Sequence, residues 1–252
     1  MDFSGQHVVI TGASSGIGRA TAKRVAAHGG RVSLIARRAG VLRDVADAIN
    51  AAGKGAAEGF AADVGVQDAL IAALNAAIAR HGAIDGLFLN AGANGRFGPL
   101  ADYDDDALDQ VMRVNATSLF WALRHVAPMM MARGKGAIVV TGSLASERGM
   151  VGNPGYLMSK HAAQGIARAV AMEAAPHGVR CNLIHPGFIL TDMLEAVPED
   201  ARRGMAALVP QQRIGSAEEA AAVAAFLLSD DASHVTCQSI AVDGGLLGTL
   251  RL

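Results

Sequence analysis

Short apolar runs alternate with longer amphipathic segments along the whole chain. The apolar runs predict strands at 7–11, 31–36, 55–62, 84–90, 136–142, 179–184 and 238–242. Between them, segments whose apolar positions recur about every 3.6 residues predict helices near 16–29, 40–52, 66–81, 104–132, 155–176 and 217–229. Such alternation indicates a parallel sheet with helices on both faces. We therefore expect an α/β, doubly wound fold of about seven parallel strands.

The alternation runs from one end to the other without a repeat, a low-complexity tract or a linker. We therefore expect residues 1–252 to form a single domain. Residues 186–216 depart from the pattern because they are rich in Met, Pro and charged side chains. We expect an excursion there with short helices of its own, in the kind of long insert that often carries function.

Composition and charge narrow the classes of function. Hydrophobic residues are 51% of the chain and charged residues 18%, an excess of apolar surface that indicates an oligomer. The 22 basic and 23 acidic side chains are interspersed, so the chain lacks the basic patch of a protein that binds nucleic acid or anionic lipid. No apolar run reaches the ~18 residues that span a bilayer, and no export signal opens the sequence. We expect a soluble protein with no nucleic-acid or membrane partner.

The two cysteines are Cys181 and Cys237, and both lie in segments that resemble buried strands. Neither has the spacing or the neighbours of a metal ligand. We expect free thiols in the core, no metal site, and a reducing cytoplasmic location.

A glycine-rich turn, "TGASSGIG", follows the first predicted strand and opens the first predicted helix. Glycines in this setting let the backbone approach a pyrophosphate, and the helix N-terminus offers free N–H groups. The spacing is G-x-x-x-G-x-G rather than G-x-G-x-x-G, and an ordinary tight turn is the alternative. We expect a dinucleotide here, and the candidate binding residues are Gly12, Ser14, Ser15, Gly16, Ile17 and Gly18.

The second predicted strand ends in "LIARRAG", which bears on the choice of dinucleotide. NAD sites usually place an acidic residue about 20 positions after the loop, but no acidic residue follows Gly18 until Asp44. Arg37 and Arg38 instead stand where a 2′-phosphate would lie, and the arginine fork suits phosphate. We therefore favour NADP over NAD. Two solvated arginines at the start of a helix are the alternative, and Ser15 adds no positive charge to the loop.

Several polar side chains are predicted to lie near the carboxyl ends of the fourth and fifth strands. Ser143 follows the fifth strand, and Tyr156 and Lys160 are one helical turn apart on the next helix. Residues at i and i+4 share a helix face, so the three side chains can converge. Asn90 ends the fourth strand and Asn115 lies within the 104–132 helix. Each residue also has an ordinary interpretation, such as a turn serine, a surface tyrosine or a buried helical asparagine.

The convergence of these side chains suits hydride transfer between an alcohol carbon and a nicotinamide. The hydroxyl proton needs a partner, but a free phenol with a pKa of about 10 is a poor base at neutrality. We expect the ammonium of Lys160, together with an oxidised nicotinamide, to lower the pKa of Tyr156. The Ser143 hydroxyl would hydrogen-bond the substrate oxygen.

Taken together, the motifs resemble the short-chain dehydrogenase/reductase family in its compact single-domain form, over nearly the whole chain. The motifs that carry the resemblance, in the family's order and spacing, are "TGASSGIG", "DV" at 63–64, "NAG" at 90–92, "VNATS" around Asn115, Ser143, "YLMSK" and "PGFILTDM" at 186–193. The resemblance implies a Rossmann fold, an NAD(P)-dependent oxidoreductase, and a homotetramer with helices 104–132 and 155–176 at an interface. Cys237 departs from the family, in which glycine is commoner at this position.

The resemblance also implies roles for individual residues. Tyr156 would be the acid/base, and Lys160 would hold the nicotinamide ribose and tune the tyrosine. Ser143 would position the substrate, and Asn115 would anchor a water in a proton relay through Lys160. The remaining implied cofactor contacts are Asp63 and Val64 on the adenine, Asn90, Ala91 and Gly92 near the ribose, and Pro186, Gly187, Ile189 and Thr191 around the carboxamide.

The substrate pocket can be assigned only by the same analogy. Its candidates are Arg96, Phe97, Leu144, Glu147, Met150, Phe188, Met193 and Leu194. A mostly apolar lining favours a lipophilic or alicyclic alcohol and ketone. His185 could approach the cofactor, or it is a satisfied core histidine.

Two other functions stay open. The first is a 3-oxoacyl-carrier-protein reductase, for which Arg133 and Lys135 are the only candidate docking cations. The second is a nucleotide-sensing or scaffold protein on the same fold. The intact set of Ser143, Tyr156 and Lys160 argues against a sensor, which has no need of it.

Overall fold

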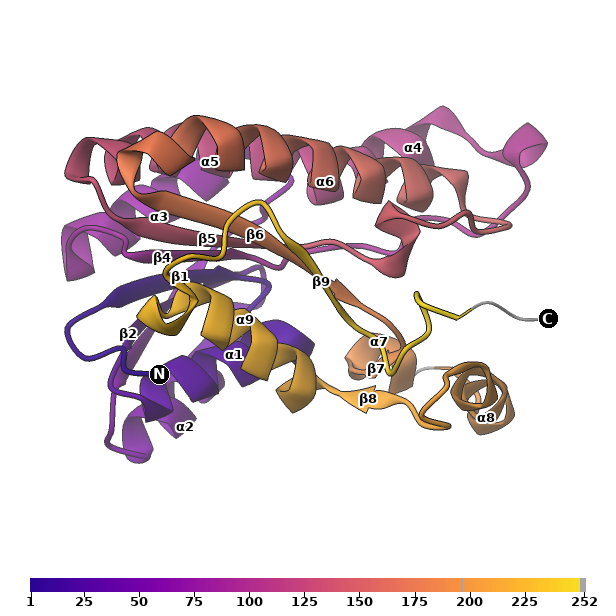
Figure 1. The fold of residues 1–252 in the computed structure, drawn as a ribbon, viewed down its shortest axis with the longest axis horizontal. Coiled ribbons are helices and arrows are strands. Elements are labelled where there is room, and N and C mark those ends of the chain that lie inside the picture. The colour runs from indigo at the N-terminus through magenta and orange to yellow at the C-terminus, as the bar shows by residue number, and fades with distance from the viewer. Residues whose placement is uncertain (196, 250–252) are drawn as a thin grey trace.

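A seven-stranded parallel sheet forms the centre of the protein, seen here in a computed structural model that describes residues 1–195 and 197–249 (Figure 1). In spatial order its strands are β3 (Ala56–Ala61), β2 (Arg31–Ala36), β1 (His7–Thr11), β4 (Gly86–Leu89), β5 (Gly136–Thr141), β6 (Val179–Pro186) and β9 (Ser239–Val242). Each neighbouring pair runs parallel. All seven predicted strands are confirmed, and so is the doubly wound, Rossmann-like fold.

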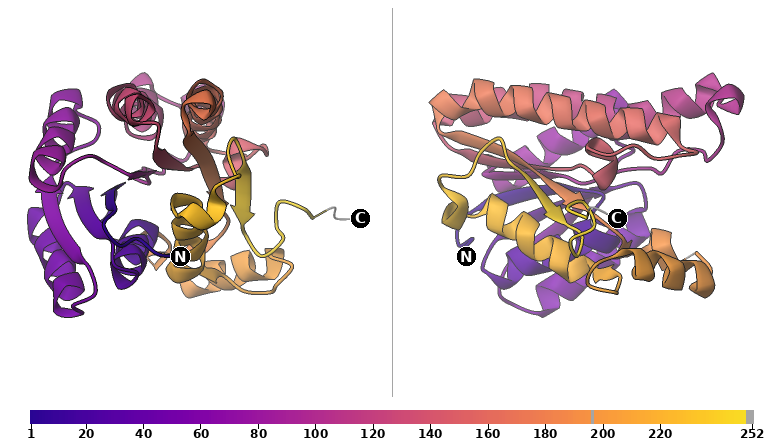
Figure 2. Two further views of the ribbon diagram at one scale, coloured as in Figure 1. Left: turned by 60° about the vertical axis from the view of Figure 1, so that its left-hand side comes forward. Right: turned by 45° about the vertical axis from the view of Figure 1, so that its right-hand side comes forward.

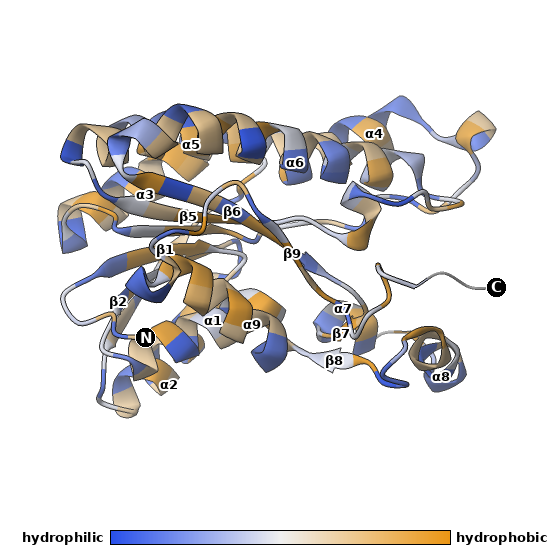
Figure 3. Cartoon of the chain, viewed as in Figure 1, coloured by the Kyte–Doolittle hydropathy of each residue, from blue (hydrophilic) through white to orange (hydrophobic). Residues whose placement is uncertain are grey.

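Helices cover both faces of this sheet, as Figures 1 and 2 show. One face carries α1 (Gly16–Ala27), α2 (Ala39–Ala51) and α9 (Ala217–Leu228); the other carries α3 (Gln67–His81), α4 (Asp105–Met112), α5 (Ser118–Arg133) and α6 (Pro154–Ala174). Consecutive residues of β1 pack on opposite faces of the sheet. Val9 packs on the face covered by α3, α5 and α6, and Val8 and Ile10 pack on the face covered by α1, α2 and α9. Burial on both faces explains why the strands read as continuous apolar runs. Figure 3 shows the helices alternating between hydrophilic and hydrophobic positions instead.

The strand order places the functional end of the sheet. The chain runs outward from β1 to β2 and β3, then returns to β4 on the other side of β1. Ligands of doubly wound sheets bind outside the carboxyl ends of the strands at such a reversal. The glycine-rich loop after β1 and the "NAG" segment after β4 meet there.

The predicted helix 104–132 is interrupted. A π-helical turn, η2 (Arg113–Thr117), separates α4 from α5, and Asn115 lies within it. A π-turn accommodates one extra residue and is often found at functional sites. The apolar periodicity continues across the turn, which is why the sequence predicted a single helix.

The excursion after β6 has short elements of its own, as expected. They are β7 (Ile189–Leu190), α7 (Asp192–Glu195), α8 (Glu199–Leu208) and β8 (Gly215–Ser216). β7 and β8 pair in parallel as a separate two-stranded ladder, which is too short to produce a sequence pattern. Within residues 1–195 and 197–249, no helix has both the length and the apolar character needed to cross a bilayer.

Cys237 does not lie in a strand, which corrects the sequence interpretation. It precedes β9, is half-buried, and has a φ of 58°, in the left-handed region that favours glycine. This backbone conformation explains why glycine is commoner there in the family that the sequence resembles. Cys181 is buried and both thiols are free, as predicted.

Candidate active site

The loop after β1 has the shape of an anion cradle. Gly12 and Gly16 have φ of 67° and 49°. A Cβ on Gly18 would lie 2.4 Å from the carbonyl oxygen of Gly12, so only glycine lets α1 start this close to the strand. The N-cap of α1, Ser15, makes no side-chain cap hydrogen bond. The first-turn N–H groups therefore suit an incoming phosphate, and the loop fits a dinucleotide.

Asn90 ties the ends of three strands together beneath this loop. Its Nδ2 donates to the carbonyl oxygens of Thr11 (3.3 Å) and Gly12 (3.4 Å), and its Oδ1 accepts from Thr141 (3.1 Å). The side chain expected near a ribose is thus occupied in bracing the loop. Ala91 follows, and its Cα would lie 2.9 Å from a Cβ on Gly12.

Both arginines at the end of β2 are exposed, next to the loop. Arg38 donates from Nη2 to the Ser14 hydroxyl at 3.2 Å, so one guanidinium lies directly on the glycine-rich segment. Arg37 precedes it. The positive charges are therefore where a 2′-phosphate was expected.

Asp63 and Val64, the two residues after β3 that were expected to contact the adenine, have side chains that contact other parts of the protein. The Asp63 carboxylate accepts from the backbone N–H of Gly65 at 2.9 Å. Val64 is buried and packs in the core beneath α3. With its side chain packed in the core, Val64 keeps its backbone for a contact with a nucleotide.

The excursion lies against the same loop through Thr191. A Cβ on Gly16 would lie 2.9 Å from the Thr191 methyl group. Ile189 is buried. Pro186 ends β6 beside β9, and the N–H of the next residue, Gly187, donates to the carbonyl oxygen of Val242 at 3.0 Å. Ile17, in the first turn of α1, packs on the core. The glycine loop and the "PGFILTDM" segment thus lie against each other.

Tyr156 and Lys160 lie on the first turns of α6. Asn153 caps the helix by accepting from the Tyr156 N–H (3.2 Å), and Pro154 occupies the first helical position. Lys160 is only 5% exposed, and its Nζ donates to the carbonyl oxygen of Thr141 at 2.9 Å. The same Nζ lies 5.7 Å from the centroid of the Tyr156 ring. A Cβ on Gly92 would lie 3.8 Å from it.

Ser143 is held against α6 by a short turn, η3 (Leu144–Ser146). The Ser143 hydroxyl accepts from the Ala145 N–H at 3.1 Å, and the Ser143 N–H donates to Ser146 Oγ at 3.2 Å. Ser146 in turn donates to the carbonyl oxygen of Lys160 at 3.0 Å. The structure thus brings Ser143, Tyr156 and Lys160 together, as the spacing predicted.

Burial is the largest influence on the pKa of Tyr156 in the polypeptide by itself. Burial raises the phenol pKa above its ordinary value, and the Ser143 side chain acts to lower it. Burial also lowers the pKa of Lys160 to about 8. The expected lowering of the phenol pKa by Lys160 together with an oxidised nicotinamide stays a prediction, and in the polypeptide by itself desolvation is the largest effect on the phenol. Ser143 is the neighbour that favours the phenolate.

Asn115 braces the site from the π-turn. Its Oδ1 accepts from the Ala93 N–H (2.7 Å), and its Nδ2 donates to the Ala93 carbonyl (2.8 Å) and to Ser159 Oγ (3.0 Å). Both amide hydrogens are therefore bonded to protein groups. The turn connects the segment after β4 to α6, and the predicted water relay remains a prediction.

The candidate pocket residues differ in their partners and exposure. Arg96 forms an ion pair with Asp104, and the Glu147 carboxylate faces His185 rather than the phenol. Phe97 and Met150 are exposed, and Leu144 and Leu194 are partly buried. The side chain of Met193 lies outside the described part of the structure.

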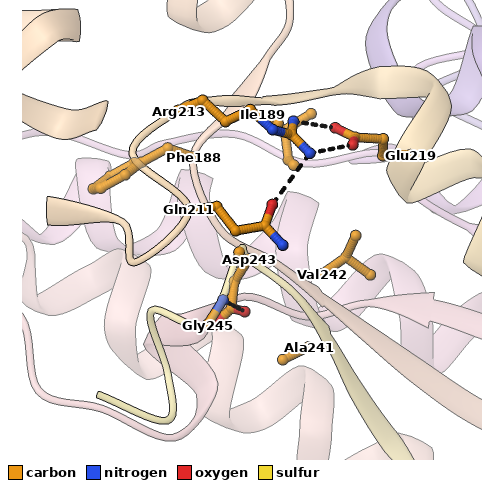
Figure 4. Close-up of a pocket in the computed structure, with 11 residues that line it drawn as sticks. Phe188, Ile189, Gln211, Arg213, Glu219, Ala241, Val242, Asp243 and Gly245 are labelled. Carbon is orange, nitrogen blue, oxygen red and sulfur yellow. Dashed lines mark hydrogen bonds and ion pairs between the residues drawn. The ribbon is translucent and has the colours of Figure 1, made fainter. Parts of the chain in front are cut away.

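Phe188 instead lines a separate cavity of about 340 Å³ (Figure 4). Arg213 dominates its polar lining and is neutralised there, because it bonds both carboxylate oxygens of Glu219 at 2.9 and 2.6 Å and reaches Gln211 at 3.1 Å. None of the residues that line the cavity is Ser143, Tyr156 or Lys160. The cavity is distinct from the catalytic set.

Several supporting residues escaped the sequence interpretation. Ser146 and Asn153 brace the turn and the helix, and Ser159 receives Asn115. The signals were present, since a serine three positions after Ser143 is a capping pattern and asparagine before proline is a helix start. Cavity and network residues contributed by distant segments have no such local signal.

Known proteins resemble this chain over almost its full length. A family model described as enoyl-(acyl carrier protein) reductase matches residues 12–247. Levodione reductase of Leifsonia aquatica is 37% identical, covering 96% of this chain and 94% of its own. The chain belongs to the short-chain dehydrogenase/reductase family. A crystal structure of levodione reductase matches this short-chain dehydrogenase/reductase with a TM-score of 0.93, at 36% identity over 98% of this chain and 100% of that one.

Further members of the family are similarly close. Cyclohexanol dehydrogenase of Acinetobacter sp. is 38% identical over 96% of this chain and 95% of its own. The 3-oxoacyl-[acyl-carrier-protein] reductase of Escherichia coli is 34% identical over 98% of this chain and 99% of its own. As a family member, the protein is an oxidoreductase that acts between an alcohol and a ketone with a nicotinamide cofactor. The enzyme interpretation is thereby favoured over a sensor or scaffold.

Proposed function

We propose that this enzyme interconverts a secondary alcohol and a ketone on a lipophilic or alicyclic substrate. The observation that carries the proposal is the convergence of Ser143, Tyr156 and Lys160 at the carboxyl edge of the sheet. Two relatives are named for cyclic substrates, levodione reductase and cyclohexanol dehydrogenase, which supports the substrate class.

The chemistry is divided among three side chains. The Tyr156 hydroxyl gives its proton to the ketone oxygen in reduction, and the phenolate takes it back in oxidation. The Ser143 hydroxyl hydrogen-bonds the same oxygen, where negative charge develops. The buried Lys160 ammonium favours the phenolate electrostatically. A nicotinamide held by the loop after β1 would supply the hydride to the ketone carbon in reduction and accept it from the alcohol carbon in oxidation.

The cofactor that we propose is NADP, held by the loop after β1 and by the arginines after β2. Backbone N–H groups of Ser15 and Gly16 suit the pyrophosphate, and the Arg38 guanidinium, already on Ser14, suits a 2′-phosphate. The other proposed contacts are those expected from the sequence, with Thr191 beside Gly16.

Titration with NADPH and NADH, followed by fluorescence, tests the cofactor preference. We expect NADPH to bind at least about tenfold tighter, a difference of ~1.4 kcal/mol. Arg38→Ala and Arg37→Ala should remove most of this difference, whereas Arg43→Ala, an exposed arginine on α2, should not. Equal or tighter binding of NADH to the unmodified protein would contradict the preference for NADP.

The position of Arg133 and Lys135 does not favour a 3-oxoacyl-carrier-protein reductase. Lys135 immediately precedes β5, and Arg133 bonds Asp85 and the carbonyl of Ile84 just before β4. Both therefore lie at the amino end of the strands, opposite the catalytic edge. Turnover of cyclohexanone should exceed that of an acetoacetyl thioester in kcat/KM by about tenfold or more. A preference for the thioester would instead assign the enzyme to acyl reduction.

We also propose a homotetramer. Four large apolar side chains are exposed on the outer helices, Phe120 and Met129 on α5 and Met158 and Met172 on α6. A patch of this kind marks an interaction surface.

A further inference from the structure

The catalytic face of α6 continues beyond Lys160. Tyr156, Lys160, Gln164 and Arg168 follow one another at four-residue intervals, so they lie on one face at successive turns. Gln164 is 9% exposed, unusual for an amide side chain unless both ends are bonded. The face that carries the chemistry therefore continues as a polar line from the buried Lys160 and Gln164 to the exposed Arg168.

Gln164 connects a cation to a buried histidine. In the orientation that satisfies both neighbours, its amide oxygen accepts from Arg168 Nη1 and Nη2 at 3.0 and 3.1 Å, and its nitrogen donates to His185 Nε2 at 3.1 Å. Arg168 has only donors, so the amide oxygen must face it. Nε2 of His185 is consequently an acceptor, and a neutral ring carries its proton on Nδ1.

The protonated Nδ1 faces a carboxylate. Glu147 Oε1 lies 3.5 Å from His185 Nδ1 and 4.0 Å from Arg168 Nη2, which closes a cycle of four side chains. Nδ1 has no hydrogen-bond partner among the described residues, so Glu147 acts on it as a nearby charge. We call Arg168, Gln164, His185 and Glu147 the His185 network.

This network supports the turn that carries Ser143. The His185 ring, fully buried, lies against the backbone of Gly142, where a Cβ would approach within 2.5 Å of the ring. Gly142 immediately precedes Ser143, and Glu147 ends the turn that follows it. The segment is thus fixed at both ends by the network and in its middle by the Ser146 hydrogen bond to Lys160.

We propose that the His185 network is a positioning device that sets the Ser143 hydroxyl against the Tyr156 phenol. The proposal rests on the proposed function in taking Tyr156 as the proton-exchanging group. It bears on the two sequence interpretations of His185, a group that approaches the cofactor or a core histidine: the ring is a buried positioning residue that acts through the turn before α6.

The charges around the ring favour the neutral form that this arrangement requires. Burial lowers the pKa of His185, Glu147 raises it, and Arg168 and Lys160 lower it. A protonated ring would present an N–H to the amide nitrogen of Gln164, and the amide could then satisfy only one neighbour. Neutral His185 therefore keeps the cycle closed beside a cationic Lys160.

Titration of the Tyr156 phenol tests the proposal without a substrate. The chain has two tyrosines, so a Tyr103→Phe background leaves a single phenol to follow by phenolate absorbance after a pH jump. The Tyr103 hydroxyl has no hydrogen-bond partner in the described residues, so its removal breaks no bond. Ser143→Ala should raise the pKa of Tyr156, because Ser143 acts to lower it.

Gln164→Met, which keeps the volume and removes the hydrogen bonds to Arg168 and His185, should also raise the Tyr156 pKa. The double variant with Ser143→Ala should show no more than the Ser143→Ala shift, because both changes act through one hydroxyl. Glu147→Ala is a second variant on a partly exposed side chain that leaves the core intact, and it should shift the pKa likewise. His161→Ala, on the exposed side of α6, is the control and should shift nothing.

An unchanged Tyr156 pKa in Gln164→Met and Glu147→Ala, or additive shifts in the double variant, would overturn the proposal. Histidine nitrogen NMR gives an independent reading, since an Nε2-protonated ring in the unmodified protein would contradict the network. On cyclohexanol, Gln164→Met should reduce kcat by about tenfold with cofactor affinity unchanged. If the unmodified enzyme fails on alicyclic substrates, the proposed function fails, while the phenol titration still decides the network.

Discussion

At the scale of single residues, the site places groups where folding alone would not favour them. The buried Lys160 ammonium donates to the backbone carbonyl of Thr141, and burial lowers its pKa to about 8. Taking an ammonium out of water is costly unless it is paired. The position is explained by catalysis, because the buried charge lies next to the phenol that exchanges the proton.

Replacing Lys160 with Met should therefore stabilise the fold while abolishing turnover. A pKa lowered from 10.5 to about 8 disfavours the charged form by roughly 3 kcal/mol, so the free energy of unfolding should rise by up to that amount at about pH 7. Between pH 8 and 10.5 the unfolded lysine binds the proton that the folded one has lost, so the unmodified protein gains stability as the pH rises. Urea unfolding at about pH 7 and about pH 10 should show that the difference in free energy of unfolding between Lys160→Met and the unmodified protein becomes smaller at the higher pH. A difference that grows with pH would contradict this account.

Cys237 carries a second residue-scale cost. Its φ of 58° costs an L-residue about 1 kcal/mol that glycine avoids. Cys237→Gly and Cys237→Ala both lose the thiol, but only the first relieves the backbone. In urea unfolding, the free energy of unfolding of the glycine variant should be about 1 kcal/mol higher than that of the alanine variant. Equal stabilities would mean that the left-handed backbone imposes no cost here.

At the scale of elements, the sequence predicted what local periodicity controls. Strands and helices appeared at the expected places because apolar spacing is a local property. The π-turn at Arg113–Thr117 was missed because its cause is not local: Asn115 bonds Ala93, 22 positions away, and Ser159, 44 positions away. The β7–β8 ladder and the His185 network likewise depend on segments brought together only by the fold.

Asn115→Ala tests the structural importance of the π-turn. The change leaves the N–H and carbonyl of Ala93 without their partner, so we expect a loss of about 2–4 kcal/mol in the free energy of unfolding. Asn75→Ala, which alters an exposed asparagine whose side chain bonds the ring of His125, should cost no more than about 0.5 kcal/mol. Comparable losses in the two variants would show that the π-turn contributes nothing special.

At the scale of the whole molecule, the strand order explains why distant motifs meet. The reversal between β1 and β4 brings the glycine loop, the "NAG" segment and the end of β5 to one edge. The sequence predicted this edge but could not predict the partners of the candidate pocket side chains, since Arg96 pairs with Asp104 and Glu147 lies 3.5 Å from His185. Long side chains choose partners in three dimensions, which spacing does not encode.

The outer face of α5 and α6 carries the prediction about assembly. If another copy covers Phe120 and Met172, then Phe120→Glu and Met172→Lys would each place an unpaired charge in the subunit interface. Because burying such a charge is costly, each change should dissociate the tetramer. Light scattering after size exclusion should show the mass falling. Val66→Glu, which alters an exposed apolar residue before α3, should leave the mass unchanged. A monomeric unmodified protein would contradict the proposed tetramer.

The central claim is that Tyr156 exchanges the proton of an alicyclic alcohol or ketone during hydride transfer. The most direct test follows nicotinamide absorbance with cyclohexanol and cyclohexanone for the unmodified enzyme and Tyr156→Phe, with cofactor affinity measured alongside. We predict turnover by the unmodified enzyme and a loss of about 10²–10⁴-fold in kcat for the variant, with cofactor affinity unchanged. Turnover retained by Tyr156→Phe would contradict the claim, and so would an unmodified enzyme that binds the cofactor but converts no alicyclic substrate.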